Sequence, residues 1–270
     1  MNLLPILALL LTNLAVAQGL PAKGTLVIAG GGTLPAAVYD AFVAACGGPG
    51  ARIAVLPAAY GEPLESTAAM NQRFQARGAV PVRVDPRTRA EAEAPVTLDT
   101  LQSCQGFWFT GGDQKRIHDL IVGTGAHRAI AAAFQAGAAV GGTSAGAAVM
   151  TSLMIEGTDD VSATAPGSYR TLEGLGLLPG CIVDQHFLRR SRHNRLLSLL
   201  MEHPDQLGLG IDEETAIRVQ AGVFRVLGSR AVLVADPGAM TVRDGGFMDL
   251  RLHLLRPGQG FDLGRRKPLP

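Results

Sequence analysis

Short apolar runs alternate with amphipathic segments along most of the chain. The apolar runs stand at residues 25–32, 52–59, 80–85, 106–112 and 138–144. Segments whose apolar side chains have helical spacing lie between them, at residues 34–46, 64–78, 113–123 and 127–137. Continuous apolar runs separated by helices are typical of strands that are covered on both faces. The pattern therefore predicts an α/β fold with a doubly wound, mostly parallel sheet.

The second part of the chain is less regular. Residues 159–180 have the composition of a long loop. The elements expected next are a strand at 181–187, a helix at 189–204 and a strand at 207–213. Beyond Thr215 the short apolar segments predict antiparallel additions, and the Gly-, Pro- and Arg-rich tail from Pro257 predicts weak order. No repeat or linker divides residues 18–270, which we expect to form one domain.

The N-terminus differs from the rest of the chain. Residues 1–19 carry no charged side chain, and Ala15-Val16-Ala17 supplies the small residues of a signal-peptidase site. Two polar residues interrupt the apolar run, which is shorter than the roughly 20 residues that a membrane span needs. We predict a signal peptide at residues 1–17 and a secreted or periplasmic protein with no membrane attachment after cleavage. An uncleaved anchor is the alternative.

Composition and charge exclude several classes of function. The chain is 47% hydrophobic and 17% charged, which is typical of a globular protein. Its net charge of +1 gives no reason to expect nucleic acid or an anionic membrane as a partner. Cys46, Cys104 and Cys181 lack CxxC spacing, and we expect three small buried residues, although an oxidising compartment permits one disulfide. No cluster has the spacing of metal ligands, so neither a metal nor a cofactor is predicted.

Ser144 is the strongest candidate for chemistry. The segment Gly142-Thr143-Ser144-Ala145-Gly146 matches G-x-S-x-G between a strand and a helix-prone stretch, which is the context that this motif requires. Small neighbours allow a sharp turn that exposes the hydroxyl. The amide of Ala145 then lies near a helix N-terminus, where free N–H groups stabilise an oxyanion. We predict that Ser144 is a nucleophile, with a tight packing turn as the alternative.

A serine nucleophile needs a base and an acid that orients the base. Of the six histidines, His186 follows an apolar strand, at the edge of an open parallel sheet where ligands collect. Asp212, Glu213 and Glu214 follow the next strand, and the pattern does not choose among these three carboxylates. The order Ser, His, acid excludes a standard α/β-hydrolase, whose order is Ser, acid, His.

A cluster of four arginines follows His186 within seven residues: Arg189, Arg190, Arg192 and Arg195. The cluster predicts either a solvated helix face or a site for carboxylates, which guanidinium groups bind through two parallel hydrogen bonds. On a helix, Arg192 and Arg195 would be neighbours because they are three positions apart.

Two glycine-rich loops complete the set of candidates. In Gly111-Gly112-Asp113-Gln114 the glycines allow close backbone approach, and Asp113 would cap the following helix. The segment 29–35 lacks the dinucleotide-binding spacing, because Pro35 stands where the third glycine would fall. We expect this second loop to form part of the floor under Ser144.

Four ordered blocks, FTGGDQ, GGTSAGA, DQHF followed by RRSRHNRL, and GIDEETA, together resemble peptidase family S51 and, within it, the branch that degrades cyanophycin. The resemblance implies a class I glutamine-amidotransferase-like fold, a flavodoxin-like three-layer sandwich. It implies a triad of Ser144, His186 and Glu213, and so selects Glu213 from the three carboxylates. It also implies a homodimer.

The resemblance further implies the residues that contact substrate, namely Asp113, Gln114, Gln185, Arg190, Arg192 and Arg195, with backbone amides of Gly112 and Ala145 at the oxyanion. The expected activity is hydrolysis of cyanophycin, which has an aspartate backbone and arginine branches, to β-Asp-Arg dipeptides by a serine exopeptidase. The expected partner is thus a peptide or polymer with aspartyl carboxylates. An Asp-X or isoaspartyl dipeptidase and a non-catalytic binding protein are the alternatives.

Overall fold

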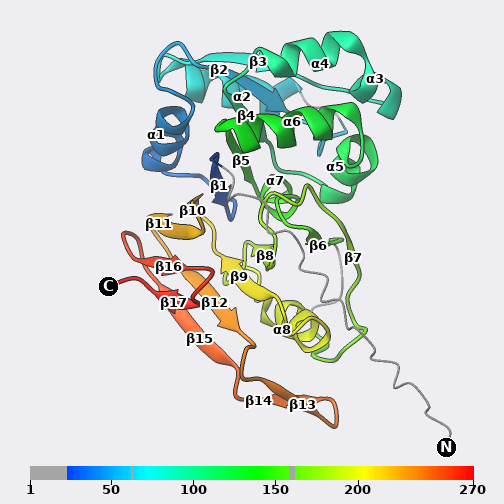
Figure 1. Cartoon of the computed structure of the whole chain (residues 1–270), viewed down its shortest axis with the longest axis vertical. Helices are drawn as coiled ribbons and strands as arrows, with labels where there is room; N and C mark the ends of the chain where they lie inside the picture. Colours follow the sequence, from blue (N-terminus) through cyan, green and yellow to red (C-terminus); the bar gives the residue numbers. More distant parts are fainter. Residues whose placement is uncertain (1–22, 62–63, 158–161) are drawn as a thin grey trace, which may run out of the picture.

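The computed structural model of the chain describes residues 23–61, 64–157 and 162–270 (Figure 1). The predicted signal peptide, residues 1–17, lies outside the described residues. The helices are α1 (Ala36–Ala45), α2 (Leu64–Gln75), α3 (Arg89–Glu93), α4 (Pro95–Gln102), α5 (Gln114–Ile121), α6 (Gly125–Ala136), α7 (Ala145–Ala148) and α8 (His193–Glu202). The first nine strands are β1 (Thr25–Ala29), β2 (Arg52–Leu56), β3 (Val80–Arg83), β4 (Gly106–Phe109), β5 (Ala139–Thr143), β6 (Leu153–Ile155), β7 (Thr171–Glu173), β8 (Cys181–Gln185) and β9 (Leu207–Ile211). The remaining strands are β10 (Thr215–Gln220), β11 (Val223–Gly228), β12 (Val232–Asp236), β13 (Thr241–Arg243), β14 (Gly246–Met248), β15 (Arg251–Leu255), β16 (Gly260–Asp262) and β17 (Lys267–Pro268).

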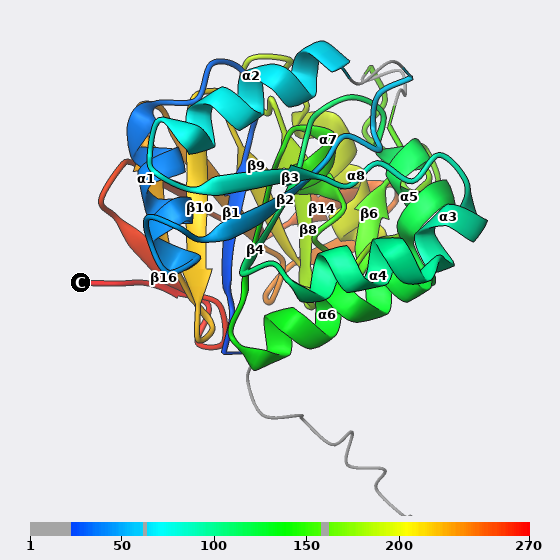
Figure 2. The same ribbon diagram turned by 90° about the horizontal axis from the view of Figure 1, so that it is seen from above.

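The main sheet has a parallel half and an antiparallel half. Its strand order is β17-β16-β11-β10-β1-β5-β4-β2-β3. The strands from β1 to β3 in that order are parallel, and β10, β11, β16 and β17 pair antiparallel. Figure 2 shows helices on both sides of this sheet. The predicted α/β fold is confirmed, and five of the nine strands of this mixed central sheet are parallel to one another.

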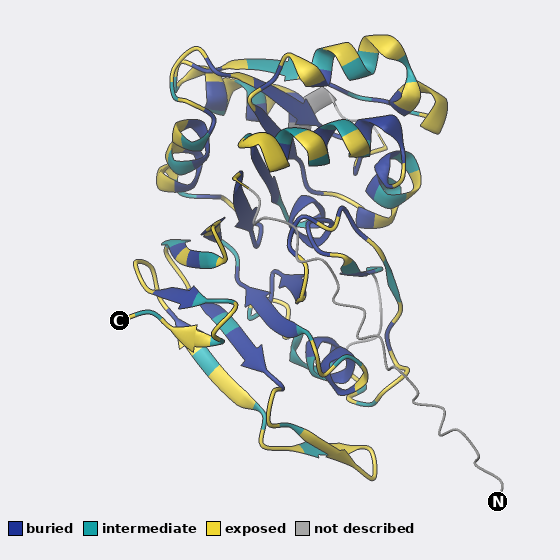
Figure 3. Ribbon diagram, in the orientation of Figure 1, coloured by how far each residue is buried: buried dark blue, intermediate teal, exposed yellow. Residues whose placement is uncertain are grey.

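Two apolar cores cover the two faces of the parallel strands. Successive side chains of a strand point to opposite faces, so Val27 and Leu26 of β1 join different cores. Val27 lies in the core under α1 and α2, where the rings of Phe42 and Trp108 meet edge to face at 4.8 Å between centroids. Leu26 lies in the core under α4 and α6, together with Phe134. The central strands of the parallel half are buried and the outer helix faces are exposed (Figure 3).

A second sheet carries two of the strands that matter most for function. The apolar pattern predicts β8 and β9 in the same parallel sheet as β1, but they belong to a four-stranded sheet of order β15-β12-β9-β8. Only β8 and β9 are parallel within it. Apolar runs identify strands but not the neighbours of those strands. The two sheets nevertheless meet at one edge, because the N–H of His186 donates to the C=O of Gly30, beyond the end of β1, at 2.8 Å.

The predictions of a long loop at 159–180 and of a weakly ordered tail are wrong for parts of these two segments. Within the predicted loop 159–180, β7 pairs with β6. The tail from Pro257 adds β16 and β17 to the main sheet, and Phe261 is fully buried there and stacks on Phe224 at 5.8 Å between ring centroids. One buried aromatic residue thus anchors a tail that is rich in Gly, Pro and Arg. In the described part of the chain, no helix combines the length and the apolar character that crossing a membrane requires.

The three cysteines have the structural role expected of small core residues. Cys46, Cys104 and Cys181 are buried and their thiols are free. Burial raises the pKa of the Cys46 thiol and that of the Cys181 thiol to about 12. Such thiols stay protonated at neutral pH and are poor nucleophiles.

Candidate active site

Ser144 stands on a sharp turn between β5 and α7. Its backbone has φ 55° and ψ −114°, a strained conformation for a residue with a side chain. The turn depends on its small neighbours, since a Cβ at Gly142 would overlap the backbone of Gly146, and a Cβ at Gly146 would overlap the carbonyl of Phe109. The sequence of this turn therefore allows the hydroxyl to project from the edge of the sheet.

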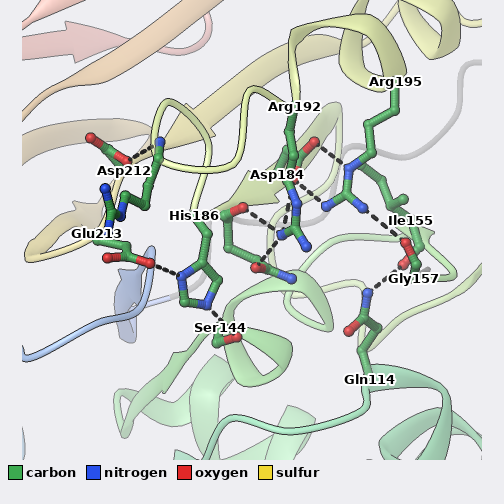
Figure 4. A network of polar contacts seen from close by, with 12 residues as sticks. Gln114, Ser144, Ile155, Gly157, Asp184, His186, Arg192, Arg195, Asp212 and Glu213 are labelled. Atoms are coloured by element: carbon green, nitrogen blue, oxygen red, sulfur yellow. Dashed lines mark hydrogen bonds and ion pairs between the residues drawn. The ribbon is translucent and has the colours of Figure 1, made fainter. Parts of the chain in front are cut away.

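His186 lies between Ser144 and Glu213. Its Nε2 is 2.9 Å from the Oγ of Ser144, and its Nδ1 is 2.7 Å from the Oε1 of Glu213 (Figure 4). His186 and Glu213 follow the ends of β8 and β9, which are neighbouring parallel strands. The structure thus brings together the three residues that the sequence singles out, with the nucleophile–base–carboxylate contacts of a serine hydrolase.

The glycine loop at 30–32 packs against His186 and Glu213, and Ala29, just before the loop, accepts from the N–H of Ser144 at 3.0 Å. The loop is hydrogen-bonded to the segment after Glu213, where the N–H of Glu214 donates to the C=O of Gly31 at 2.8 Å. Gly31 has φ +112°, and a Cβ there would overlap the imidazole of His186. A Cβ at Gly32 would come within 3.0 Å of the Cβ of Glu213. The glycines let the backbone approach both side chains closely.

The surroundings of His186 favour its neutral form. Burial lowers the pKa of the imidazole, and the hydrogen bond that its Nδ1–H donates to Glu213 opposes that effect. The pKa of Glu213 is itself lowered, first by the hydrogen bond with His186. Glu213 is therefore ionised and His186 neutral at neutral pH, which leaves Nε2 free to accept a proton from Ser144.

A cavity of about 330 Å³ opens at the hydroxyl of Ser144. Its lining residues are Gly112, Asp113, Gln114, Lys115, Ser144, Glu156, Gly157, Arg170, Gln185, Arg190 and Arg192. Five of the six residues expected to contact substrate therefore border it. Lys115, Glu156 and Arg170 were not singled out from the sequence; Glu156 and Arg170 pair at 3.1 Å, and no motif marks them.

The polar side chains of this cavity differ in how firmly they are held. Arg192 donates through Nη1 to the backbone oxygen and the Oε1 of Gln185, at 2.7 and 2.6 Å. Burial lowers the pKa of Arg192 to about 10, so the guanidinium stays charged at neutral pH. Gln114 is buried and donates to the C=O of Ile155 at 3.2 Å. Arg190 is exposed and projects from the turn after His186.

Asp113 also has the structural role that its position predicts. It is the N-cap of α5, and its Oδ1 accepts from the N–H of Lys115 at 2.8 Å. Gly112 precedes it with φ +130° and lies against the carbonyl of Ala59, so only glycine fits there. The next loop residue back, Gly111, lies beside Ser144, because a Cβ there would be 3.3 Å from the Cβ of Ser144.

The expected contact between Arg195 and substrate does not fit the position of Arg195. The side chain is 2% exposed and does not line the cavity. Its Nε and Nη2 donate to the carboxylate of Asp184, at 2.7 and 2.5 Å, and its Nη1 donates to the C=O of Gly157 at 2.8 Å. Helix α8 begins only at His193, with Arg192 as its N-cap, so the two arginines are not neighbours on a helix face.

The described residues offer no metal site, and the amides of Ala145 and Gly112 are the groups predicted to bind an oxyanion. Within residues 23–61, 64–157 and 162–270, no three His, Cys, Asp or Glu side chains are grouped so that they could hold a metal ion. Ala145 is the first residue of α7 and follows Ser144 directly. Its N–H has no helical partner four residues earlier, as is general for the first turn of a helix. Gly112 borders the cavity from the opposite loop.

Comparison with known proteins identifies the family of this chain. The family model described as peptidase family S51 matches residues 26–227. The chain belongs to peptidase family S51. This match covers the nucleophile turn, His186 and Glu213, and the family recognised from the four sequence blocks is confirmed.

Several S51 relatives are similar over most of their length. The cyanophycinase of Trichormus variabilis is 36% identical over 245 residues, which cover 86% of this chain and 82% of that protein. The cyanophycinase of Geminocystis herdmanii is 34% identical over 244 residues, 86% of this chain and 90% of that protein.

Solved structures support the fold of this S51 member. The crystal structure of a peptidase from an acI-B1 Actinobacterium has a TM-score of 0.71 at 19% identity and covers 90% of this chain and 98% of its own. The crystal structure described as a putative peptidase E protein from Listeria monocytogenes EGD-e has a TM-score of 0.56 at 16% identity. It covers 77% of this chain and 99% of its own. The class I glutamine-amidotransferase-like fold predicted from the sequence is confirmed.

Proposed function

We propose that this S51 peptidase is a secreted serine-type exopeptidase that hydrolyses cyanophycin to β-Asp-Arg dipeptides. The observation that carries the proposal is the continuous contact from Ser144 through His186 to Glu213, at the mouth of a polar cavity. The 34–36% identity to proteins named cyanophycinase supports the substrate. The apolar N-terminus with its small residues at Ala15 and Ala17 supports secretion, and a polymer outside the cell is a substrate that cannot cross a membrane intact.

The reaction begins when the Oγ of Ser144 attacks the scissile aspartyl carbonyl. His186 takes the hydroxyl proton at Nε2, and Glu213 holds the imidazole in the required tautomer and stabilises its cation. The N–H groups of Ala145 and Gly112 bind the oxyanion. His186 then gives its proton to the leaving amine, and water hydrolyses the acyl-enzyme with His186 again acting as base.

The cavity supplies the grip on the substrate. Arg190 and Arg192 bind carboxylates of the unit being cut, because a guanidinium matches a carboxylate with two parallel hydrogen bonds. Gln185, Gln114 and Asp113 offer further polar contacts in the same cavity. The two carboxylates that border the cavity, Asp113 and Glu156, suit the guanidinium of an arginine branch.

Incubation of the purified mature protein with insoluble cyanophycin tests this function. We expect the suspension to clear and the soluble product to have the mass and fragmentation pattern of β-Asp-Arg. Release of free aspartate from Asp-Leu or isoaspartyl dipeptides, with no clearing of cyanophycin, would instead identify a dipeptidase with the same triad. The absence of both activities, with no labelling of Ser144 by serine-reactive probes, would indicate a binding protein.

A further inference from the structure

A second hollow of about 430 Å³ lies beside the catalytic edge and has no part in the mechanism above. It is lined by Leu188, Arg189, Asp212, Arg230, Ala231 and Arg256. Its charged lining thus consists of three guanidinium groups and one carboxylate. Concave surfaces lined mainly by one sign of charge attract ligands of the opposite sign. The lining therefore favours an anion.

Two of the three arginines are available to a ligand. Among the described residues, neither Arg189 nor Arg256 has a side-chain hydrogen bond or ion pair, and both are exposed. The third, Arg230, already pairs with Glu214 at 3.2 Å, and it lies 3.9 Å from the buried carboxylate of Asp212. The Oδ1 of Asp212 accepts from the backbone N–H of Arg189 at 3.0 Å, which fixes the turn that carries this arginine.

The second hollow is joined to the active site through the two segments that supply His186 and Glu213. Arg189 and Arg190 are consecutive residues on the turn after His186, yet Arg190 lines the cavity at Ser144 and Arg189 lines the second hollow. Asp212, which also lines the second hollow, directly precedes Glu213 in the chain. Figure 4 shows Asp212 on the far side of Glu213 from Ser144. The turn after His186 thus borders both spaces.

The chemistry of the proposed substrate fits a second anion site. In a β-Asp-Arg unit the arginine is joined through its amino group, so its own carboxylate is free in every repeat of the polymer. An extended chain advances about 3.3–3.6 Å per residue. Ser144 is separated from Glu213 by the imidazole ring of His186 and by its two hydrogen bonds, of 2.9 and 2.7 Å. A repeat that reaches the second hollow is therefore at least two residues from the bond under attack.

We propose that the second hollow is a carboxylate-binding subsite in which Arg189 and Arg256 hold a distal repeat of the polymer while Ser144 cuts its end. The inference rests on the function proposed above, since it assigns the repeat units of that substrate to a place on the protein. Such a subsite favours long chains over short ones, because a second contact on the same chain raises the effective concentration of the scissile end.

The test compares a long and a short substrate in an Arg189→Ala/Arg256→Ala variant. Hydrogen bonds to charged groups are among the stronger ones in proteins, so we expect kcat/KM on the polymer to fall about tenfold or more. On an oligomer of two repeats we expect kcat/KM within about twofold of wild type. The matched control is Arg243→Ala/Arg265→Ala, which removes the same charge from side chains that are 81% and 84% exposed outside the hollow. Equal losses on both substrates, an equal loss in the control, or no loss on the polymer would overturn the subsite.

A binding measurement keeps this test separate from catalysis. In a Ser144→Ala background, we expect the same pair of substitutions to reduce co-sedimentation with insoluble cyanophycin, and the control pair to leave it unchanged. If the wild-type protein cuts neither substrate, the proposed function fails, and co-sedimentation alone still decides the subsite. Equal binding by the two arginine variants would then contradict it.

Discussion

The Nε2 atom of His186 lies 2.9 Å from the Oγ atom of Ser144, although the two residues are 42 positions apart in the chain and belong to different sheets. The contact exists because β5 of the main sheet and β8 of the second sheet end at one shared edge. The N–H of Ser144 donates to the C=O of Ala29 at 3.0 Å, and the N–H of His186 donates to the C=O of Gly30 at 2.8 Å. The end of β1 thus fixes the backbones of nucleophile and base relative to each other.

Replacing Glu213 by Gln tests the third member of the triad. We expect kcat to fall by about 10²- to 10⁴-fold, because an amide neither stabilises the imidazolium nor enforces the required tautomer. The measurement is the rate of dipeptide release under saturating substrate. Glu214→Gln is the matched control, since the neighbouring carboxylate pairs with Arg230 and not with His186. Equal effects of the two substitutions would contradict the role of Glu213.

The pH dependence of kcat/KM reports the protonation of His186. The base must be neutral, and burial lowers its pKa from the ordinary value of 6.5. Because the imidazole stays neutral to a lower pH than usual, we expect kcat/KM to be level near neutrality and to fall through a midpoint below pH 6.5. The hydrogen bond with Glu213 raises this pKa, so in Glu213→Gln the midpoint of the residual activity should move further down. An acid limb above pH 6.5 in the wild type would speak against His186 as the base.

Gly31→Ala tests the close approach of the 30–32 loop to the imidazole. A Cβ at Gly31 would overlap the His186 ring, and a displacement of about 1 Å at a catalytic group costs on the order of 10²-fold in rate. We expect a loss of that size in kcat. The control is Gly245→Ala, which has a positive φ of +77° but nothing within 4 Å of its Cβ, and so shares the backbone strain without the contact. If both variants lose stability alike and keep full activity, the loop has no role in placing His186.

Asp184→Ala tests the buried ion pair behind the cavity. Asp184 is fully buried and Arg195 is 2% exposed, so removal of the carboxylate leaves a buried charge without its partner. Loss of one member of such a pair costs about 3–5 kcal/mol. We expect denaturant unfolding to show a decrease of this size in the free energy of unfolding, and the double variant Asp184→Leu/Arg195→Met to recover part of it. A decrease below about 1 kcal/mol would mean that Arg195 finds solvent or another partner.

The three residues of the triad could be predicted from the sequence because each of them stands in a local pattern. Ser144 stands in a strand–turn–helix pattern, and His186 and Glu213 follow apolar strands. The sheet to which β8 and β9 belong could not be predicted, because an apolar run is compatible with any buried neighbour. The Phe261 anchor of the tail was missed for a related reason, since its partner Phe224 lies on a strand far away in sequence.

The role of Arg195 was missed although the sequence holds a signal for it. Asp184 interrupts the apolar run of β8, and a carboxylate in a fully buried strand requires a charged partner. The arginine cluster 11 residues later supplies that partner. Which arginine takes this place, and which ones remain for substrate, depends on the turn after His186. That turn includes Ser191, which has a positive φ of 50°. Helical spacing of the arginines in the sequence does not predict such a turn.

Ser144→Ala is the measurement that tests the central claim most directly. We expect dipeptide release from insoluble cyanophycin to fall by at least about 10⁴-fold, with thermal unfolding close to that of the wild type. Ser103→Ala, at an exposed serine hydroxyl away from the cavity, should release dipeptide at the wild-type rate. Turnover by Ser144→Ala at a rate comparable to that of the wild type, in a folded protein, would contradict the assignment of Ser144 as the nucleophile.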